Sequence, residues 1–117
     1  MILGIGTDIV DNRRFVDAPM GLLEKIYTER ELEEYRLRLD KAQYLGSRFA
    51  AKEAFVKALG TGFGSVAAKD VCIVSEGNAR PYIVLSDKVD FHGKIHLSIS
   101  HENDYSTAMV VIEDGSL

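Results

Sequence analysis

Four charged residues lie inside a segment whose other residues suit a buried helix. The segment reads RFAAKEAFVKALGTG, from Arg48 to Gly62, and its apolar residues fall on nearly every side of a helix. Burying a charge without a partner costs on the order of several kcal/mol. Partners of opposite charge, within the protein or in a ligand, are therefore needed for Arg48, Lys52, Glu53 and Lys57.

Glu53 and Lys57 are four residues apart, so they lie on one side of the helix. One interpretation is an ion pair along an exposed face, which contributes only ~0.2–0.5 kcal/mol. The apolar neighbours Phe49 and Ala54 favour another, in which the carboxylate of Glu53 binds a divalent cation. Magnesium takes one or two carboxylates together with water and phosphate oxygens. Such a site needs a second carboxylate from elsewhere in the chain.

Asp8 is the candidate for that second carboxylate. Residues 2–10 alternate in type, which predicts a strand with an apolar face made of Leu3, Ile5, Thr7 and Ile9. The other face carries Asp8 and two glycines, which leave room for another backbone or a ligand to approach closely. Asp8 is thus either a metal ligand or, with Asp11, part of the turn that follows the strand.

His101 is the third unusual residue. It continues the alternation of Ile95, Leu97 and Ile99, so its side chain is expected on the apolar side of a strand, at the strand end. A histidine in this position is a hydrogen-bonded core residue, a donor to phosphate, or an acid or base. No metal-ligand spacing links it to the other two histidines, and the chain has no P-loop, Rossmann fingerprint or nucleophile elbow.

Length and composition bound the class of protein. The 117 residues suit one domain, 1–117, and 46% hydrophobic with 27% charged residues is an ordinary globular composition. A net charge of −4 argues against bulk binding of nucleic acid, and no apolar run is long enough to span a membrane. The single cysteine, Cys72, lies in an apolar run and is expected to be a buried thiol. Without a signal-peptide pattern, a cytoplasmic location is expected.

Basic residues concentrate in one region of this acidic chain. Residues 36–57 contain six basic residues against two acidic ones. Arg36, Arg38 and Lys41 are interpreted as a solvated helix face. The alternative for the region is a binding site for a compact anion such as a phosphorylated ligand.

The order of the predicted elements indicates an α+β fold with a small, largely antiparallel sheet against a long buried helix. A short helix follows Asp11, further helices are expected over 20–27, from the capping box at Thr28 to about Leu39, and over 41–59 with Gly60 as its C-cap. Strands are predicted over 70–75 and 81–85, joined by a turn at 76–80, and over 95–101 and 105–113. Another short helix is expected after Ser86.

Three stretches together resemble the 4′-phosphopantetheinyl transferases: GIGTDIV at 4–10, the segment at 48–62, and LSISHENDYSTAMVV at 97–111. The element F-x-x-K-E-A-x-x-K at 49–57 is the specific part, and the resemblance covers the whole chain in order and length. Residues 34–47 and 63–70 match only loosely. Members of this family transfer the phosphopantetheine arm of coenzyme A to a serine of apo-acyl carrier protein, and release 3′,5′-ADP.

The resemblance implies roles for the unusual residues around the reacting phosphates. Asp8 and Glu53 would be the magnesium ligands. Lys57 would stabilise or protonate the leaving phosphate, and His101 would contact the pyrophosphate. Either Glu53 or a metal-bound water would take the serine proton.

The resemblance also implies how the two substrates are held. Coenzyme A would be bound by Arg48, Lys52, Lys57, Gly60, Gly62 and His101. The acidic carrier protein would dock on Arg14 with Arg13 beside it.

Short members of the family are homotrimers, which implies active sites between subunits, with Asp8, Glu53 and Lys57 from one chain and His101 from its neighbour. Fatty acid synthesis is the process that such enzymes usually serve. Two alternatives belong to other classes: a non-catalytic module that binds coenzyme A or a nucleotide on the same fold, and a structural or interaction protein whose charges form internal ion pairs.

Overall fold

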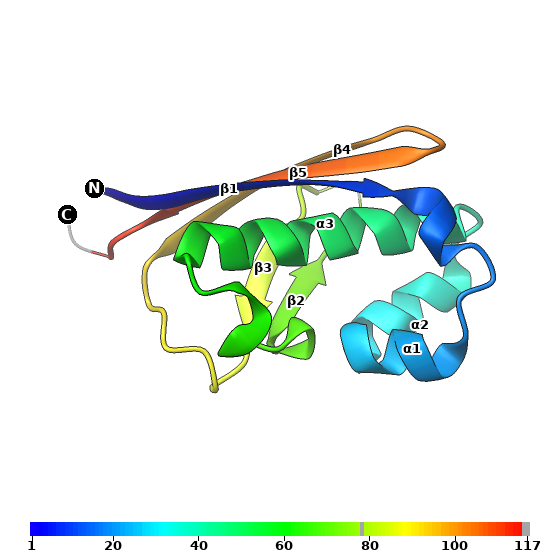
Figure 1. Ribbon diagram of the computed structural model, residues 1–117, viewed down its shortest axis with the longest axis horizontal. Coiled ribbons are helices and arrows are strands. Elements are labelled where there is room, and N and C mark those ends of the chain that lie inside the picture. The colour runs from blue at the N-terminus through cyan, green and yellow to red at the C-terminus, as the bar shows by residue number, and fades with distance from the viewer. Residues whose placement is uncertain (78, 116–117) are drawn as a thin grey trace.

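A three-stranded antiparallel sheet covers one side of the long helix α3, which spans Lys41–Leu59 (Figure 1). The computed structural model describes residues 1–77 and 79–115. The sheet has the order β1-β5-β4, formed by β1 (Ile2–Asp11), β5 (Tyr105–Glu113) and β4 (Lys94–His101). β1 and β4 are therefore the two edges of this sheet, and each pairs with β5.

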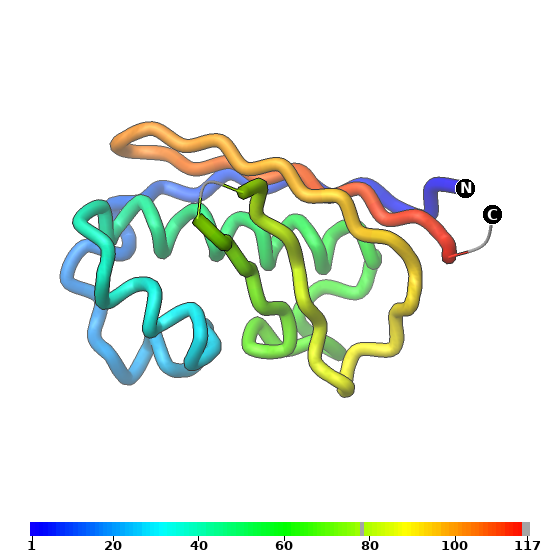
Figure 2. Tube along the Cα trace, turned by 180° about the vertical axis from the view of Figure 1, so that it is seen from behind, coloured from blue at the N-terminus to red at the C-terminus, as the bar shows by residue number. Residues whose placement is uncertain are grey.

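The opposite side of α3 is covered by smaller elements. They are the helices α1 (Met20–Ile26) and α2 (Glu29–Leu37), and an antiparallel hairpin of β2 (Val71–Val74) and β3 (Tyr82–Leu85). Figures 1 and 2 show α3 lying between these elements and the three-stranded sheet. This enclosure explains why α3 is apolar on nearly all sides, and the predicted α+β fold is confirmed. Within the two described ranges, no helix has the length and apolar character needed to cross a membrane.

Local signals in the sequence locate the ends of the helices. Thr28 and Glu31 form the predicted capping box at the start of α2, with both reciprocal hydrogen bonds present. α2 ends at Leu37, two residues before the expected end, because Arg38 is already extended and binds Asp40. Gly60 ends α3 in the left-handed conformation, at φ 80°, as predicted.

Short 3-10 helices and turns connect these elements. One such helix, Asn12–Phe15, follows β1 as expected and is capped by Asp11, and two others span Gly62–Gly64 and Ala68–Asp70. The helix predicted after Ser86 is wrong, because the segment makes one turn, closed by a bond from the Val89 N–H to the Ser86 carbonyl, before it reaches β4. Residue 78, inside the predicted turn at 76–80, lies outside the described residues.

Cys72 on β2 is half-buried, and its Sγ lies 3.3 Å from Oγ1 of Thr28. Burial raises the pKa of the Cys72 thiol, which keeps it protonated at neutral pH. The thiol therefore behaves as part of the packing between β2 and α2, but it is half-buried and not fully buried as predicted.

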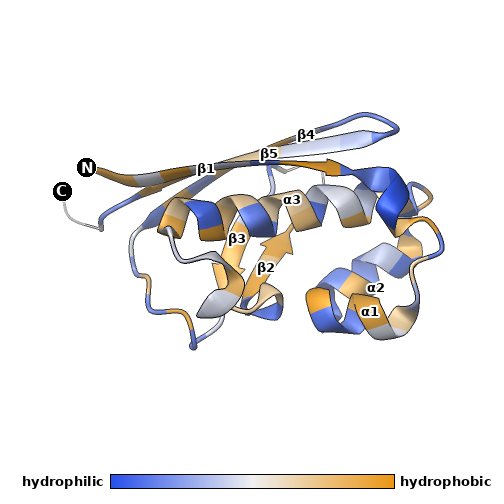
Figure 3. Ribbon diagram, in the orientation of Figure 1, coloured by the Kyte–Doolittle hydropathy of each residue, from blue (hydrophilic) through white to orange (hydrophobic). Residues whose placement is uncertain are grey.

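The two faces of β1 meet different surroundings. Gly4 and Gly6 face α3, and a Cβ built on Gly6 would lie only 1.9 Å from the Ala54 carbonyl oxygen. The close approach predicted for the glycine face is therefore made by the backbone of α3. The apolar face points away from the core, so that Ile5 and Ile9 are 58% and 65% exposed. Figure 3 shows that hydrophobic residues recur along β1.

Gly6→Ala is expected to lower the free energy of unfolding by about 1–3 kcal/mol, because the added methyl group must push β1 away from α3. Gly21→Ala is the matched control: it lies in α1 with open space around its Cα, and should stabilise by ~0.5–1 kcal/mol. Urea unfolding at a fixed protein concentration measures both. Equal effects of the two substitutions would contradict the close packing of β1 on α3.

Candidate functional site

Asp8 and Lys57 form an ion pair at the free edge of the three-stranded sheet. The Lys57 ammonium donates to Oδ1 of Asp8 at 2.9 Å and to the Thr7 carbonyl at 3.1 Å. Asp8 is mostly buried on the inner face of β1, whereas the Lys57 side chain is half exposed on α3. The hydrogen bond with Asp8 raises the pKa of Lys57, so the ammonium stays charged.

Glu53 lies beside this pair, half-buried one helical turn before Lys57. Burial raises the pKa of the Glu53 carboxyl, and the charge of Asp8 raises it further, while Lys57 and Arg14 lower it. Lys57 pairs with Asp8 across the two elements rather than with Glu53 along the helix. The structure thus brings together Asp8, Glu53 and Lys57, which the sequence had indicated from two distant segments.

The donor set suits a small divalent cation. The ammonium of Lys57 pairs with Asp8 and lies near Glu53, so these three residues together carry a net charge of −1. No cluster of three or more His, Cys, Asp or Glu residues able to hold a metal is found among residues 1–77 and 79–115. Magnesium does not require such a cluster, because it retains waters and uses substrate phosphates as ligands.

A cavity of about 580 Å³ begins at the Asp8–Lys57 pair and extends over the outer face of the sheet. Its lining includes small polar residues of β4 and β5 next to Ile9 of β1: Ser98, Ser100 and Thr107. Its size lies within the usual range for small-molecule sites. The ion pair is therefore accessible from a surface that can accept a ligand.

The glycines after α3 have backbone conformations that require glycine. Gly60 and Gly62 have φ angles of 80° and 64°, and both are exposed. The Gly60 N–H is already bonded to the Val56 and Lys57 carbonyls, so it caps α3. Contact of these two glycines with coenzyme A stays a prediction.

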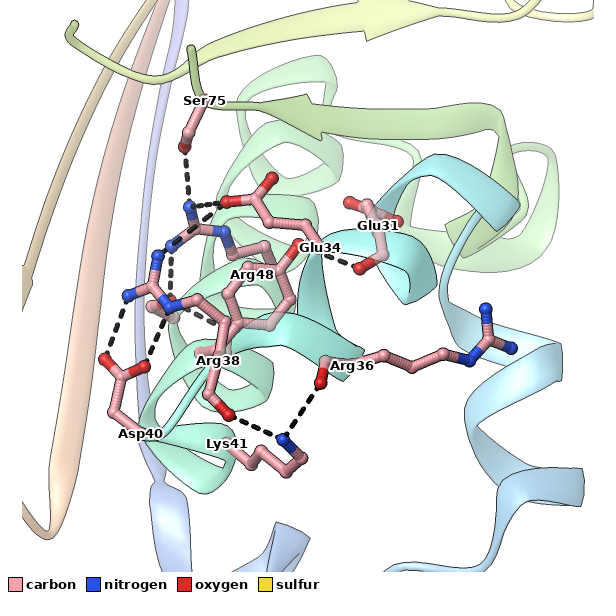
Figure 4. Close-up of polar contacts among 10 residues, drawn as sticks. Glu31, Glu34, Arg36, Arg38, Asp40, Lys41, Arg48 and Ser75 are labelled. Carbon is pink, nitrogen blue, oxygen red and sulfur yellow. Dashed lines mark hydrogen bonds and ion pairs between the residues drawn. The ribbon is translucent and has the colours of Figure 1, made fainter. Parts of the chain in front are cut away.

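Arg48 lies in a separate polar group with Glu34 and Ser75 (Figure 4). Its guanidinium donates to Oγ of Ser47 at 3.0 Å and to Oγ of Ser75 at 2.6 Å, and it approaches Glu34 at 3.6 Å. It also lies 4.4 Å from the centre of the Tyr44 ring. Its buried Nε has no hydrogen-bond partner within the described ranges. A cavity of about 660 Å³ opens here, lined also by Arg30 and Arg38, so Arg48 remains a candidate for an anion.

The structure gives Lys52 a different role from the predicted contact with coenzyme A. The side chain is fully buried, and its ammonium donates to Glu31 Oε1 at 2.8 Å and to the Ala68 and Val71 carbonyls at 2.9 and 2.6 Å. All three ammonium hydrogens therefore have partners inside the protein. A direct contact between Lys52 and a ligand is excluded by this geometry, and we correct the prediction accordingly.

His101 is exposed at the end of β4, so it is not a core residue. It lies close enough to Asp40 to contribute to the lowered pKa of that carboxyl, whose main cause is the hydrogen bond with Arg38. β4 is the edge opposite β1, so one chain keeps His101 apart from Asp8. His101 instead lies near the polar group of Arg48, which continues through Glu34 and Arg38 to Asp40 (Figure 4).

The two arginines predicted to dock the carrier protein differ in their contacts. Arg13 is held by Asp11 through two bonds of 2.9 Å, and it also donates to the Tyr105 hydroxyl. Arg14 is exposed, and its guanidinium carbon lies 5.7 Å from the centre of the Phe49 ring. Because Arg14 also lowers the pKa of Glu53, it lies near the Asp8–Glu53–Lys57 group.

Comparison with known proteins identifies the family. The sequence model of the 4′-phosphopantetheinyl transferase superfamily matches residues 4–110. The chain belongs to this superfamily.

Its relatives carry a more specific name. The holo-[acyl-carrier-protein] synthase of Wolbachia pipientis subsp. Culex pipiens is 46% identical over 121 residues, which cover 96% of this chain and 98% of that protein. The crystal structure of a holo-(acyl-carrier-protein) synthase from Bacillus anthracis, in complex with CoA (3′,5′-ADP), matches with a TM-score of 0.87 and 35% identity over 97% of this chain and 98% of that one. The synthase from Helicobacter pylori, in complex with coenzyme A, matches with a TM-score of 0.81 and 32% identity, covering 93% and 99%.

Two partners of the buried charges were missed from the sequence. Glu31 was assigned only to the capping box, yet it also neutralises Lys52. Glu34, next to Arg48, had no distinguishing signal because it is one of several acidic residues in α2. The available signal for Glu31 was its place in the first turn of a helix, beside an apolar residue.

The ionisation of Glu53 provides a test of the three-residue group. Asp8→Asn should lower the pKa of Glu53, because a nearby negative charge disfavours its ionised form. Lys57→Met should raise that pKa, since a favourable positive charge is lost. Carbon-13 NMR titration of the carboxyl groups in the presence of a chelator measures both, with Lys25→Met on α1 as the control. An unchanged Glu53 titration in both variants would mean that the group is not assembled as described.

Proposed function

We propose that this chain transfers the 4′-phosphopantetheine group of coenzyme A to a serine of apo-acyl carrier protein, and releases 3′,5′-ADP. The observation that carries the proposal is the grouping of Asp8, Glu53 and Lys57 at the rim of a cavity. Relatives that match nearly the whole chain are named holo-[acyl-carrier-protein] synthase, and two are in complex with coenzyme A. The proposed location is the cytoplasm, and the proposed process is fatty acid biosynthesis.

In this reaction the serine oxygen attacks the β-phosphorus of coenzyme A. A phosphorus–oxygen bond forms to the serine, the bond to 3′,5′-ADP breaks, and the serine proton passes to Glu53 or to a water molecule. Catalysis of phosphoryl transfer depends mainly on positioning the reactants and neutralising their charge. Lys57 suits the second task, because its ammonium is half exposed and its pKa is raised.

We propose Asp8 and Glu53 as the residues that hold Mg²⁺. Their two carboxylates and the excess negative charge of the group fit this ion. When bound, Mg²⁺ supplies charge neutralisation at the pyrophosphate. In the ligand-free protein, Lys57 neutralises Asp8 and thereby reduces repulsion between the two carboxylates.

We further propose that the active sites of a homotrimer lie between subunits. The residues predicted for one ligand divide into two groups within a chain: Asp8, Glu53 and Lys57 at the β1 edge, and Arg48 and His101 on the other side. The outer face of β1 and β5 is apolar and exposed, including Ile5, Ile9 and Met109 at 49–65%. Contact between chains along this face would cover the apolar side chains and bring complementary groups together. The number of subunits follows from the family resemblance.

The carrier protein is proposed to dock beside Arg14. This arginine is exposed, has no ion-pair partner within the described ranges and lies near Glu53. An acidic partner would be attracted to its free charge. Arg13 contributes less to the surface potential, because Asp11 already neutralises it.

Incubation with apo-carrier protein, coenzyme A and Mg²⁺ should increase the intact mass of the carrier by one phosphopantetheine group. Chelation should abolish the increase, and Asp8→Ala or Glu53→Ala should lower turnover by about 100-fold or more, since loss of a metal's charge costs several kcal/mol in the transition state. Asp114→Ala is the control, a carboxylate whose ion pair within the described residues is with the N-terminus. Binding of coenzyme A without transfer would favour the non-catalytic module, and folded variants with full turnover would refute the metal site.

Sites between subunits predict complementation between two inactive variants. Asp8→Ala and His101→Ala proteins should each have little activity alone. After they are dissociated and reassembled together, some interfaces should combine an intact Asp8 with an intact His101 and recover activity. Native mass spectrometry establishes that mixed oligomers have formed. Mixed oligomers without recovered activity would mean that each site is built within one chain.

A further inference from the structure

The ion pair of Glu31 and Lys52 is the most deeply buried charged group that the proposed reaction leaves unused. The two residues are 1% and 0% exposed, and their charged atoms are 2.8 Å apart. Glu31 also accepts hydrogen bonds from the backbone N–H groups of Thr28 and Ile73. The carboxylate thus joins the start of α2 and strand β2 to the ammonium group on α3.

Lys52 extends this connection to the segment that follows α3. Its other two hydrogen bonds go to the carbonyls of Ala68 and Val71, on either side of the last turn before β2. The segment 60–67 leaves α3 at Gly60 and ends directly before Ala68. One end of this segment is held by the C-cap of α3, and the other end is held by Lys52 of the same helix.

Between its two ends, the segment 60–67 is held mainly by apolar contacts of Phe63 and Val66 with the core. Three of its residues are glycines, which favour many backbone conformations. Val66 is buried, and the Ala67 N–H donates to Asp70, but the glycines at 60, 62 and 64 are all exposed. The position of the exposed glycines therefore depends on these apolar contacts and on how firmly the two ends are fixed.

The stability of the fold alone does not explain the buried ion pair of Glu31 and Lys52, because apolar residues of similar volume often replace such a pair without loss of stability. Burial lowers the pKa of Lys52, with Glu31 opposing that effect. An apolar side chain could fill the same space. It could not donate to two backbone carbonyls at once, which is the property that a lysine ammonium provides here.

We propose that Lys52, through its hydrogen bonds to the Ala68 and Val71 carbonyls, is a positioning residue that fixes the segment 60–67 for the binding of coenzyme A. The proposal rests on the proposed function and on the predicted contact of Gly60 and Gly62 with this substrate. It differs from the direct contact first predicted for Lys52, because the ammonium acts on the ligand only through the backbone that it holds. It also differs from a purely stabilising role, which would leave the affinity for coenzyme A unchanged in the folded protein.

Two variants separate the effect of the ion pair from that of the backbone anchor, by which we mean the hydrogen bonds from Lys52 to the Ala68 and Val71 carbonyls. Glu31→Gln removes the charge of the partner, but leaves Lys52 able to donate to Ala68 and Val71. Glu31→Gln combined with Lys52→Met removes the anchor as well, without leaving Glu31 buried as an unpaired anion. Glu31→Gln with Lys52→Leu is the second double variant, for use if the first does not fold. Tyr44→Phe serves as a destabilised control, since it removes a buried bond to the Glu31 carbonyl away from the segment.

The first measurement needs no activity. Hydrogen exchange in the ligand-free protein should show faster exchange for backbone amides of 61–67 in the double variant than in Glu31→Gln, with β5 amides as the internal reference. The second measurement is steady-state kinetics. The KM for coenzyme A should rise by about tenfold in the double variant and stay near the wild-type value in Glu31→Gln and Tyr44→Phe, since small displacements of positioning groups cost up to about 100-fold. The KM for the carrier protein should not change.

The outcomes distinguish this proposal from the proposed function. If the wild-type protein transfers no phosphopantetheine, the proposed function fails, and the exchange measurement still tests the anchor. If wild-type transfer is observed but both the exchange and the KM for coenzyme A are the same in the double variant and Glu31→Gln, Lys52 does not position the segment. Equal increases of the KM in the double variant and Tyr44→Phe would also overturn the proposal, because they would reflect general destabilisation.

Discussion

The close contact between β1 and α3 is the constraint on which the candidate site depends. Gly4 and Gly6 allow the strand to lie directly on the carbonyl groups of Ala54 and Ala58. Asp8 follows on the same face of β1, so it meets the helix at Lys57. A bulkier residue at Gly6 would separate the two backbones and with them the paired charges. The geometry of the polar group is therefore a consequence of backbone packing rather than of the charges themselves.

Because different elements cover the two sides of α3, its charged residues lie in different surroundings. Arg48 and Lys52 face the layer of α2 and β2, where serine hydroxyls, carbonyls and carboxylates of the same chain receive them. Glu53 and Lys57 face the free edge of the three-stranded sheet. A single helix thus combines internal charge compensation with the display of charges at a cavity. Neighbouring positions in sequence, such as Lys52 and Glu53, differ completely in role because they point in different directions.

Much of this arrangement could be predicted from local patterns. The bounds of α3, the capping box and the strands follow from periodicity and from single residues such as Gly60. The convergence of Asp8 with Glu53 was indicated by two residue types that folding alone does not require. The burial of Lys52 could not be predicted, because its partner Glu31 is 21 residues away and its other acceptors are backbone carbonyls without a sequence signal. The separation of His101 from Asp8 depends on strand order, which alternation along a strand does not reveal.

The exposed apolar face of β1 has a consequence for how the molecule responds to dilution. Ile5 and Ile9 lie on the same strand as Asp8, so a partner surface that covers them also fixes the backbone that carries Asp8. If copies of this chain associate along that face, dissociation exposes the apolar side chains to water and at the same time separates the residues of the active site. Specific activity would then fall with decreasing protein concentration, more steeply than the fraction of folded chains. The concentration of the protein in the cell would determine which fraction of the chains is in the active oligomer.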